Sequence, residues 1–456
     1  MKKILIPIIL LLILTTNSCN LYKHYERPDI SFVDSLYNKI PMANSYESIA
    51  RMTWKELFAD TLLQEYIELG LENNTDLEIS RLKVEQAEAT LQTSRLAFFP
   101  SVSFSAQINV GNNNAEHTTK ASYSLAPSAS WEIDAFGRMH NTKKGVQAAL
   151  GATEAYQQAV QTQLIATIAD SYYTLLMLDE QLDISKRTLK TWEENIRTLS
   201  ALKRAGKTNE AAVLQAKANK VNVEGSILTL EKQIIEQENS LSALLGIIPQ
   251  EFERGTLENQ VFPDTLLTGL PLSSLINRPD VRQAEYKLVE AYYATNVARS
   301  YFYPTITLSG NGGWSGAMGN IDNPGDWIYN IVAGLVQPIF NQGKNKARLK
   351  ISESQRQEAL LNFKQTLLDA GTEANNALVS WQTARKRLDS DKLQIMYLKG
   401  AVFNTQLLMK NGQATYIEVL SAQKNLLQAE LTESNDKYIE IQSVITLYHA
   451  LGGGLE

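Results

Sequence analysis

Polar and apolar side chains alternate along two early stretches of the chain. In residues 101–110, serine, glutamine and asparagine take the odd positions, while valine, phenylalanine, alanine and isoleucine take the even ones. Residues 121–131 alternate in the same way, with aromatic and aliphatic side chains against serines. A period of two places the two kinds of side chain on opposite faces of a strand. The pattern predicts two two-faced β-strands joined by a loop over residues 111–120.

The same alternation returns in the second half of the chain. Threonine, serine and asparagine from Thr305 to Asn311 alternate with apolar residues, and residues 327–337 predict a fourth strand with weaker alternation. A loop rich in glycine and asparagine, residues 315–326, separates these two strands. The chain therefore contributes four strands in two pairs.

These strands have the properties of membrane strands. Each approaches the roughly 9–11 residues that cross a bilayer in a tilted barrel. Their polar faces are almost uncharged, as a water-filled lumen favours, and tryptophans 131, 314 and 327 stand at strand ends, where interfacial aromatic side chains occur. The alternative is a soluble β-sandwich. We expect lipid to contact Val102, Phe104, Ile108, Tyr123, Leu125, Ile306 and Leu308, and the lumen to contact Ser103, Ser105, Gln107, Thr307 and Ser309.

Helical periodicity fills most of the remaining chain. It follows the Trp54–Asp60 stretch and runs to about Ala97. It returns from Thr142 to Ala205, where about 1.5 Å per residue gives a helix of roughly 100 Å. Return helices are expected at residues 210–245 and 416–451. Two rows with a spacing of seven predict a coiled-coil seam in the long helix. The rows are Ile168, Leu175, Leu182, Leu189 and Ile196, and Ser171, Leu178, Ser185, Trp192 and Leu199; Ala374, Trp381, Leu388, Ile395 and Val402 form the row of the second half.

The chain is an internal repeat. Gly412 follows Gly206 by 206 residues, and the Val-Leu-x-Ala run after each glycine keeps that offset. Before the helices the offset is 204, as between Asn73 and Asn277, so two residues are inserted just after Phe340. Each glycine supplies the left-handed residue that ends one helix before the next begins. The repeats therefore each comprise helix, two strands, long helix, tight turn and return helix.

These patterns divide the chain into five segments. They are a signal peptide at 1–18, a lipidated linker at 19–53, a first repeat at 54–250, a connector at 251–271 and a second repeat at 272–456. The apolar run before Cys19 is typical of a secretory signal, and a small residue directly before a lone cysteine resembles a bacterial lipobox. We predict that Cys19 is lipidated; the alternative is an ordinary signal peptide with a bystander cysteine.

Four membrane strands cannot close by themselves. Unpaired edges would expose backbone N–H and C=O groups to lipid at several kcal/mol each, and bacterial barrels begin at about eight strands. Copies of the chain must therefore pool their strands, giving eight, twelve or sixteen for a dimer, trimer or tetramer. This argument demands an oligomer without choosing among the three.

Composition and motifs exclude several classes of function. Among 456 residues the formal net charge is −6 without a basic run, which argues against a nucleic-acid partner. The four histidines are scattered, so we expect no metal site and no cofactor. Gly206-Lys207-Thr208 lacks the first glycine of a phosphate loop, and residues 313–317 miss the last residue of a nucleophile elbow. The chain is therefore not expected to be an enzyme.

Four motifs in order resemble the TolC-type outer-membrane efflux proteins, specifically their lipoprotein branch. They are Trp54-x-x-Leu57-Phe58-x-Asp60, Trp131-Glu132-Ile133-Asp134-x-Phe136-Gly137-Arg138, Arg278-Pro279-Asp280-x-Arg282-x-Ala284-Glu285 and Gln337-Pro338-Ile339-Phe340-x-x-Gly343. The resemblance covers essentially all of the mature chain. It implies an α+β membrane protein, a homotrimer with a twelve-stranded barrel and a periplasmic helical tunnel, placed in the outer membrane. It also implies a periplasmic adaptor and an inner-membrane pump as partners. From the residues alone, the motif glycines, Pro279 and Asp280 are interpreted as structural.

The resemblance also implies a gate at the periplasmic end, closed by inward helices with acidic residues around the axis. The matching positions are Glu418 and Ser421, of which Ser421 departs from the acidic residue of the family. Ala414 stands where the family has a basic residue, and the first-half counterpart of Glu418 is Ala212. Alternatively, Glu418 completes a capping box with Thr415. The adaptor would contact the turns at Gly206, Lys207, Gly412 and Gln413.

The leading functional hypothesis is a passive export duct whose energy comes from the partner pump. A structural or adhesive surface lipoprotein without a channel is the alternative, and an envelope hydrolase is disfavoured by the missing catalytic constellation. The cargo cannot be read from these residues.

Overall fold

The computed structural model describes residues 22–29, 52–113, 118–260, 262, 275–317 and 326–453. The signal peptide and Cys19 lie outside these residues, as do much of the predicted linker and part of the predicted connector. The chain forms two compact units. The first comprises the described parts of Met1–Asp29, Leu82–Ala155 and Arg282–Gln365, and the second those of Ile30–Arg81, Tyr156–Val281 and Thr366–Glu456. Each unit thus draws residues from both sequence repeats.

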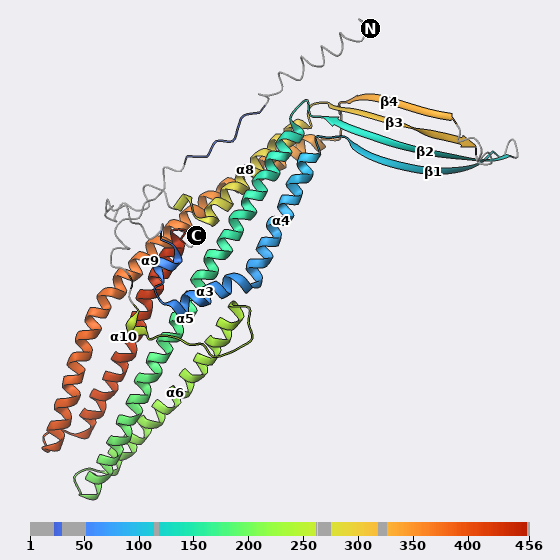
Figure 1. Ribbon diagram of the computed structural model, residues 1–456. Helices are drawn as coiled ribbons and strands as arrows, with labels where there is room; N and C mark the ends of the chain where they lie inside the picture. Colours follow the sequence, from blue (N-terminus) through green and yellow to red (C-terminus); the bar gives the residue numbers. More distant parts are fainter. Residues whose placement is uncertain are drawn as a thin grey trace. The chain divides into compact units, whose positions relative to one another are not determined.

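The first unit contains a four-stranded antiparallel sheet in the order β1–β2–β3–β4 (Figure 1). Its strands are β1 (Ser101–Asn113), β2 (Thr118–Ile133), β3 (Thr305–Ala317) and β4 (Asp326–Val336). The strands are longer than predicted at their loop ends, because hydrogen-bonded pairing continues through polar residues to Asn113 and Thr118. Among the described residues, β1 and β4 each pair on one side only.

The strand register confirms the two predicted faces. Phe104 lies opposite Pro127 and Ile108 opposite Tyr123, whereas Ser103 lies opposite Ser128. Directly paired residues share a face, so the apolar set continues from β1 through β2 into β3 and β4. The apolar pairs in the last two ladders include Leu125–Trp314, Trp131–Leu308, Ile306–Leu335 and Trp314–Trp327. The weaker alternation of β4 places Ile328 and Val332 on the polar face, opposite Gly313 and Ser309.

Four long helices begin or end at this sheet. They are α4 (Thr75–Leu96), α5 (Arg138–Arg204), α8 (Pro279–Ser300) and α9 (Lys344–Lys410). α5 and α9 are each 67 residues long, as the repeat requires. At the start of α5, Gly137 adopts φ +70°, and the inserted pair before α9 places Gln342 at +57° and Gly343 at +79°. The two-residue insertion therefore adds one left-handed residue, Gln342, to a turn from strand to helix that is otherwise equivalent in the two repeats.

The second unit contains the return helices α6 (Glu210–Leu244) and α10 (Tyr416–Ala450). The predicted helix that runs to about Ala97 is divided into α3 (Thr61–Asn73) and α4. The short α2 (Trp54–Leu57) precedes it, and a 3₁₀ turn η4 (Leu257–Asn259) lies further along the chain. Asp60 caps α3 by accepting the N–H of Leu62 at 3.0 Å, and Asn74 caps α4 by accepting the N–H of Leu77 at 3.0 Å. The cap at Asn74, which competes with the helical backbone, thus explains why one predicted helix is two.

The predicted heptad seam is buried in this unit. Ile168, Leu175 and Leu199 have no exposed surface, and Trp192 retains 2%. Trp192 and Leu199 of α5 pack with Val213, Ala216, Val223 and Ile227 of α6 and with Tyr416 and Leu420 of α10. Leu182, Leu189 and Ile196 are half-buried against this cluster. Both rows therefore stabilise the packing of the helices, as predicted.

Candidate functional site

The two tip hairpins, residues 202–216 and 409–422, have the same turn. Gly206 and Gly412 adopt φ +68° and +74°. In the first, the N–H of Lys207 donates to Leu202 O at 2.9 Å, and in the second the N–H of Gln413 donates to Leu408 O at 2.9 Å. This hydrogen bond, from an N–H to the carbonyl five residues earlier, is that of a Schellman motif, which ends α5 and α9. A Cβ on either glycine would meet no atom within 4 Å, so the turns are open to a partner.

The helix that follows each turn is capped differently. In the first tip hairpin, the side chain of Asn209 accepts the N–H of Ala212 at 3.1 Å. In the second, Thr415 donates to Oε1 of Glu418 from its N–H at 3.3 Å and from its hydroxyl at 3.0 Å. The capping box considered as an alternative role for Glu418 is therefore formed.

The candidate gate residues lie on one exposed side of α10. Glu418 and Ser421 are exposed, whereas Val419, Leu420 and Ala422 between and beside them are buried. The side of α10 that carries Glu418 and Ser421 is therefore the side of the second tip hairpin that is accessible to another chain. The capping role does not remove Glu418 from that exposed side.

The second quoted motif anchors the start of α5. The carboxylate of Asp134 accepts the N–H groups of Met139 and His140 at 3.0 and 2.8 Å. Arg138 forms a two-point ion pair with Glu132, with its Nε 3.0 Å from Oε1. Phe136 stacks on Tyr303, with ring centroids 5.2 Å apart. These contacts confirm the structural interpretation of the motif.

Arg278 of the third motif is the centre of a buried ion cluster. Its guanidinium donates to Asp280 at 2.8 and 3.0 Å, to Glu373 at 2.8 Å and to Ala450 O at 2.8 Å. His449 lies 3.5 Å from Glu373. Burial alone would raise the pKa of Glu373, but the contacts with His449 and Arg278 lower it to about 2. Pro279 begins α8, and Asp280 caps it by accepting the N–H of Val281 at 2.8 Å, as expected.

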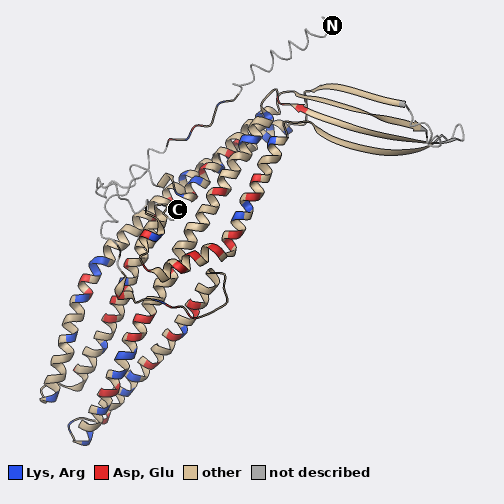
Figure 2. Ribbon diagram, viewed as in Figure 1, with Lys and Arg blue, Asp and Glu red and all other residues tan. Residues whose placement is uncertain are grey.

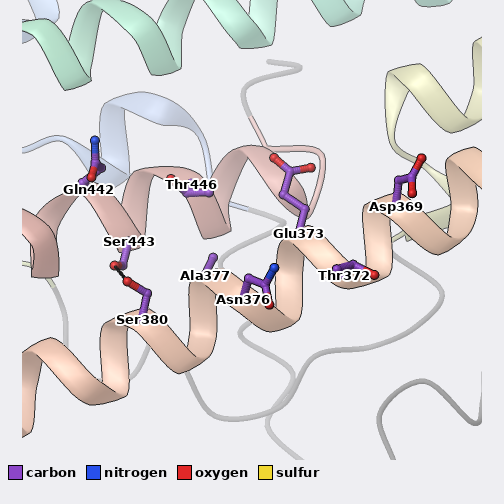
Figure 3. A pocket seen from close by; sticks show the side chains of 9 residues that line it. All are labelled: Asp369, Thr372, Glu373, Asn376, Ala377, Ser380, Gln442, Ser443 and Thr446. Carbon is purple, nitrogen blue, oxygen red and sulfur yellow. Dashed lines mark hydrogen bonds between the residues drawn. The ribbon is translucent and has the colours of Figure 1, made fainter.

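A polar groove of about 480 Å³ extends from this cluster along α9 and α10 (Figure 3). α9 contributes Glu373 and Ser380, and α10 contributes Ser443, whose hydroxyl oxygen lies 3.0 Å from that of Ser380. The same oxygen lies 2.7 Å from Ile439 O. The two serines therefore bind each other and the α10 backbone rather than facing the groove without partners. Its other lining residues are Asp369, Thr372, Asn376, Ala377, Gln442 and Thr446.

Sequence reasoning missed a second ion cluster in the predicted connector. Arg254 donates to Asp179 at 2.5 Å and to Glu238 at 2.5 Å. It also donates to the carbonyl of Phe252 at 3.2 Å. Charged partners 75 and 16 residues away leave no local signal, so only the fold reveals this contact.

The described residues, 22–29, 52–113, 118–260, 262, 275–317 and 326–453, limit the chemistry available. In that part of the chain, no group of three histidine, cysteine or acidic side chains is arranged to hold a metal ion. None of the helices described is both long and apolar enough to span a membrane.

The described strands form a sheet with one polar and one apolar face, and this sheet is connected to α5 and α9, which are each 67 residues long. This combination defines the class of outer-membrane channels with a helical tunnel. The sequence profile described as "Outer membrane efflux protein" matches residues 66–247 and 270–453. The chain belongs to this family. The two matched segments correspond to the two repeats.

Relatives match along nearly the whole chain. The "Probable outer membrane lipoprotein SilC" of Salmonella typhimurium is 29% identical over 444 residues, 95% of each chain. The "Cation efflux system protein CusC" of Escherichia coli O6:H1 is 27% identical over 454 residues, 99% of this chain and 98% of the relative. A crystal structure of CusC has a TM-score of 0.86 and 26% identity, covering 96% of this chain and all of that one. The "Solvent efflux pump outer membrane protein SrpC" of Pseudomonas putida is 28% identical over 410 residues, 88% and 87% of the two chains.

These findings establish the function at the level of the family. The chain is the outer-membrane channel of a tripartite efflux system, a passive duct for substrates delivered by a periplasmic adaptor and an inner-membrane pump. Outer-membrane factors of this kind are trimers, so their strands form a twelve-stranded barrel that continues into a helical tunnel. Family members are channel proteins.

Proposed function

We propose that three copies of this chain form a lipid-anchored duct whose two tip hairpins receive the adaptor and whose second tip hairpin forms the gate. The observation that carries the proposal is the sheet: its apolar face is continuous over four strands, and in the part of the chain that the structure describes β1 and β4 each pair on one side only. Only pairing with neighbouring copies satisfies both edges in lipid.

An apolar row on α6 supports the same assembly in the second unit. Leu214, Val221, Leu228 and Ile235 recur every seven residues and are all more than half exposed. A second apolar row with this period, on the side of α6 away from its buried cluster, is typical of a coiled-coil seam. A second copy of this chain is the occupant that fits, because the barrel already requires neighbouring copies.

Planar-bilayer conductance of the purified full chain tests the duct against the alternative of a structural or adhesive lipoprotein. The duct predicts discrete conductance steps from a species with the mass of three chains. A purified, folded oligomer that inserts into the bilayer without conductance would support the alternative. The solvent-facing serines and asparagines of the sheet favour conductance.

Cys19 is the proposed site of lipidation, and its role is anchoring rather than pore formation. A buried acyl chain adds about 0.8 kcal/mol per CH₂, whereas the strands span the membrane themselves. Mass spectrometry of the mature protein should find the N-terminal residue to be an acylated Cys19. A mature chain that begins before Cys19 and carries no lipid would contradict this proposal.

The adaptor contacts are proposed at Gly206 and Lys207 in the first tip hairpin and at Gly412 and Gln413 in the second. Their common φ values and open surroundings support two equivalent docking positions per chain. Photo-crosslinkers at Lys207 and Gln413 should capture the adaptor encoded with this system. A crosslinker at Lys190, an exposed position within α5, is the matched control.

The cargo class stays open within the duct proposal. The names of two relatives specify cation efflux for CusC and solvent efflux for SrpC. Such different cargoes pass through homologous ducts, which favours selection by the pump. Export measured with exchanged partner pumps should follow the pump rather than this chain.

A further inference from the structure

The described residues directly after the signal region are fixed against the first unit. Arg27 forms a two-point ion pair with Glu285 of α8, at 2.6 and 2.7 Å. The hydroxyl of Tyr292 donates to Lys23 O at 2.8 Å, and the Tyr292 ring meets that of Tyr25 edge to face at 5.7 Å. These contacts give Lys23 and its neighbours a defined position where the helices join the strands.

Two cavities flank this segment, and we name them the junction cavities. The first has about 590 Å³ and includes Lys23, His24, His140 and Lys144 in its lining. The second has about 550 Å³ and includes Lys23, Arg299 and Arg356. Tyr22 and Lys23 line both. All of these residues belong to the first unit.

The charge of the junction cavities opposes that of the chain, which has a formal net charge of −6. Among the residues that line the two cavities, Asp134 is the sole carboxylate, and its oxygens already accept two N–H groups of α5. Burial and then the Lys144 ammonium lower the pKa of His140, with Lys143 and His24 acting in the same direction against Asp134. Glu353, which lines neither cavity, lies 3.8 Å from Arg299. With Glu353 counted, Lys23, Lys144, Arg299 and Arg356 outnumber the two carboxylates, so the cavities carry a net positive charge that an anion would neutralise. Figure 2 shows lysine and arginine on the helix ends next to the sheet.

The residues that line the junction cavities indicate the depth of these cavities relative to the membrane. Phe98, Asp134 and Gly137 of the first cavity lie in the connections between the strands and α4 or α5. Phe302 and Tyr303 of the second cavity precede β3, and both are exposed. The indole N–H of Trp131 donates to Phe98 O at 2.9 Å. Aromatic side chains at strand ends mark the level of lipid headgroups.

From these observations we infer that the junction cavities bind the phosphate headgroup of an anionic phospholipid from the leaflet on the helical side of the membrane. Lys23, Lys144, Arg299 and Arg356 supply the cations, and the surrounding aromatic side chains contact the glycerol and upper acyl region. A basic cavity at headgroup depth is the arrangement that recognises such lipids. The site uses the barrel alone and goes beyond the proposed duct; the proposed lipid on Cys19 would enter the same leaflet.

Native mass spectrometry of the delipidated, full-length trimer with added phosphatidylglycerol tests the inference. Lys23→Gln, Lys144→Gln and Arg356→Gln should each weaken phosphatidylglycerol binding about five-fold, and their combination roughly a hundred-fold. Lys190→Gln, which removes an exposed lysine further along α5, should leave binding unchanged. Phosphatidylcholine, which has the phosphate but no net charge, should bind much more weakly than phosphatidylglycerol.

Three results would overturn the lipid site. They are unchanged binding in the triple variant, equal binding of phosphatidylcholine to the wild type, and displacement of phosphatidylglycerol by equimolar inorganic phosphate, which would assign the cavities to a free anion. The same spectra report the trimer mass, and bilayer conductance of the triple variant reports the duct. A conducting trimer that has lost selective lipid binding supports the site, and failure of the site leaves the duct proposal intact.

Discussion

The two repeats of this chain use different side chains to bind the last carbonyl groups of their return helices. In the first, the amide of Asn74 donates to Leu244 O, near the end of α6, at 2.9 Å. In the second, the equivalent residue is Arg278, which donates to Ala450 O, near the end of α10, at 2.8 Å. Each donor satisfies a carbonyl that the helix terminus leaves without a partner. The repeats therefore share the required hydrogen bond while the chemistry of the donor differs.

The difference has consequences beyond that bond. Arg278 also binds Asp280 and Glu373, so the second repeat joins α8, α9 and α10 through charge. Thr167 occupies the position equivalent to Glu373 in the first repeat, and its hydroxyl donates to its own helix at Gln163 O. The first repeat instead places its ion cluster at Arg254, outside the repeated pattern. Both repeats need a donor for the carbonyl at the end of the return helix. They differ in the ion pairs and hydrogen bonds that join their helices.

The strongest test of the repeat comparison is at the lipid face, where the two repeats should behave alike. Phe104→Arg, and Leu308→Arg at the equivalent position 204 residues later, each place a charge on the apolar face of the sheet. Near mid-bilayer each should cost about 2–4 kcal/mol. Trimer yield in the outer membrane, measured for both variants, should fall strongly.

Ser105→Arg is the matched control, because Ser105 lies on the polar face opposite Ala126. Its trimer yield should fall much less. Equal yields from Phe104→Arg and Ser105→Arg would contradict the assignment of the two faces.

The second test separates the repeats at their helix-end donors. Arg278→Ala removes a donor that is 4% exposed and leaves Glu373 without its main cation. A fully buried pair would lose about 3–5 kcal/mol; partial exposure of both carboxylates reduces the expected loss to about 2 kcal/mol. Asn74→Ala removes one neutral hydrogen bond and should cost about 1 kcal/mol.

Thermal dissociation of the purified trimer in detergent measures both changes. Arg278→Asn, which gives the second repeat the donor of the first, should fall between the wild type and Arg278→Ala. If Arg278→Asn is as stable as the wild type, the carbonyl contact alone matters and the charge cluster contributes nothing.

Sequence periodicity predicted the strands, the long helices and the tip hairpins because these features depend on local, regular spacing. The faces of β1 and β2 follow from alternation, and Gly206 and Gly412 stand where the chain needs a left-handed residue. The pattern does not indicate the break at Asn74, because a side chain there competes with a helical backbone that the pattern favours. It predicts one helix up to about Ala97 where the structure has α3 and α4.

The candidate sites were less accessible to sequence reasoning. The quoted motif included Arg278, but its partner Glu373 lies 95 residues away and gives no signal in the motif. The junction cavities combine Lys23, Lys144 and Arg356, which come from three distant segments. Contacts of this kind depend on how helices pack, and a single sequence does not encode that packing in a readable period.

The third prediction concerns pH and applies to the second repeat alone. The folded protein holds the pKa of Glu373 at about 2, below its usual value of 4.5. A lowered folded-state pKa contributes stability that is present above about pH 4.5 and is lost as the pH falls through about 2. Because Glu373 is partly exposed, we expect the contribution to be about 1 kcal/mol after solvent screening.

The measurement is the stability difference between the wild type and Glu373→Gln as a function of pH. The difference should shrink as the pH falls from about 4.5 toward 2. Thr167→Val, which changes the equivalent position of the first repeat, should give a difference that does not depend on pH over the same range. A pH-independent Glu373→Gln difference would mean that its carboxylate is not stabilised by Arg278 and His449.

The smallest effect on stability and the sharpest contrast between repeats are expected at the tips. Glu418→Gln keeps a side chain that can accept the N–H of Thr415 and close the capping box, so trimer stability should change by less than about 0.5 kcal/mol. It removes one negative charge per chain, repeated by symmetry around the proposed gate. Cation selectivity and block by divalent cations should both decrease in bilayer conductance, because a ring of carboxylates attracts cations.

The first repeat offers the control: Glu210→Gln, at the start of α6, removes the same charge from the other tip hairpin, where Glu210 pairs with Lys203. It should leave cation block unchanged. Block that is equal in the wild type, Glu418→Gln and Glu210→Gln would remove Glu418 from the gate and leave closure to the packing of Tyr416 and Leu420 against α5 and α6.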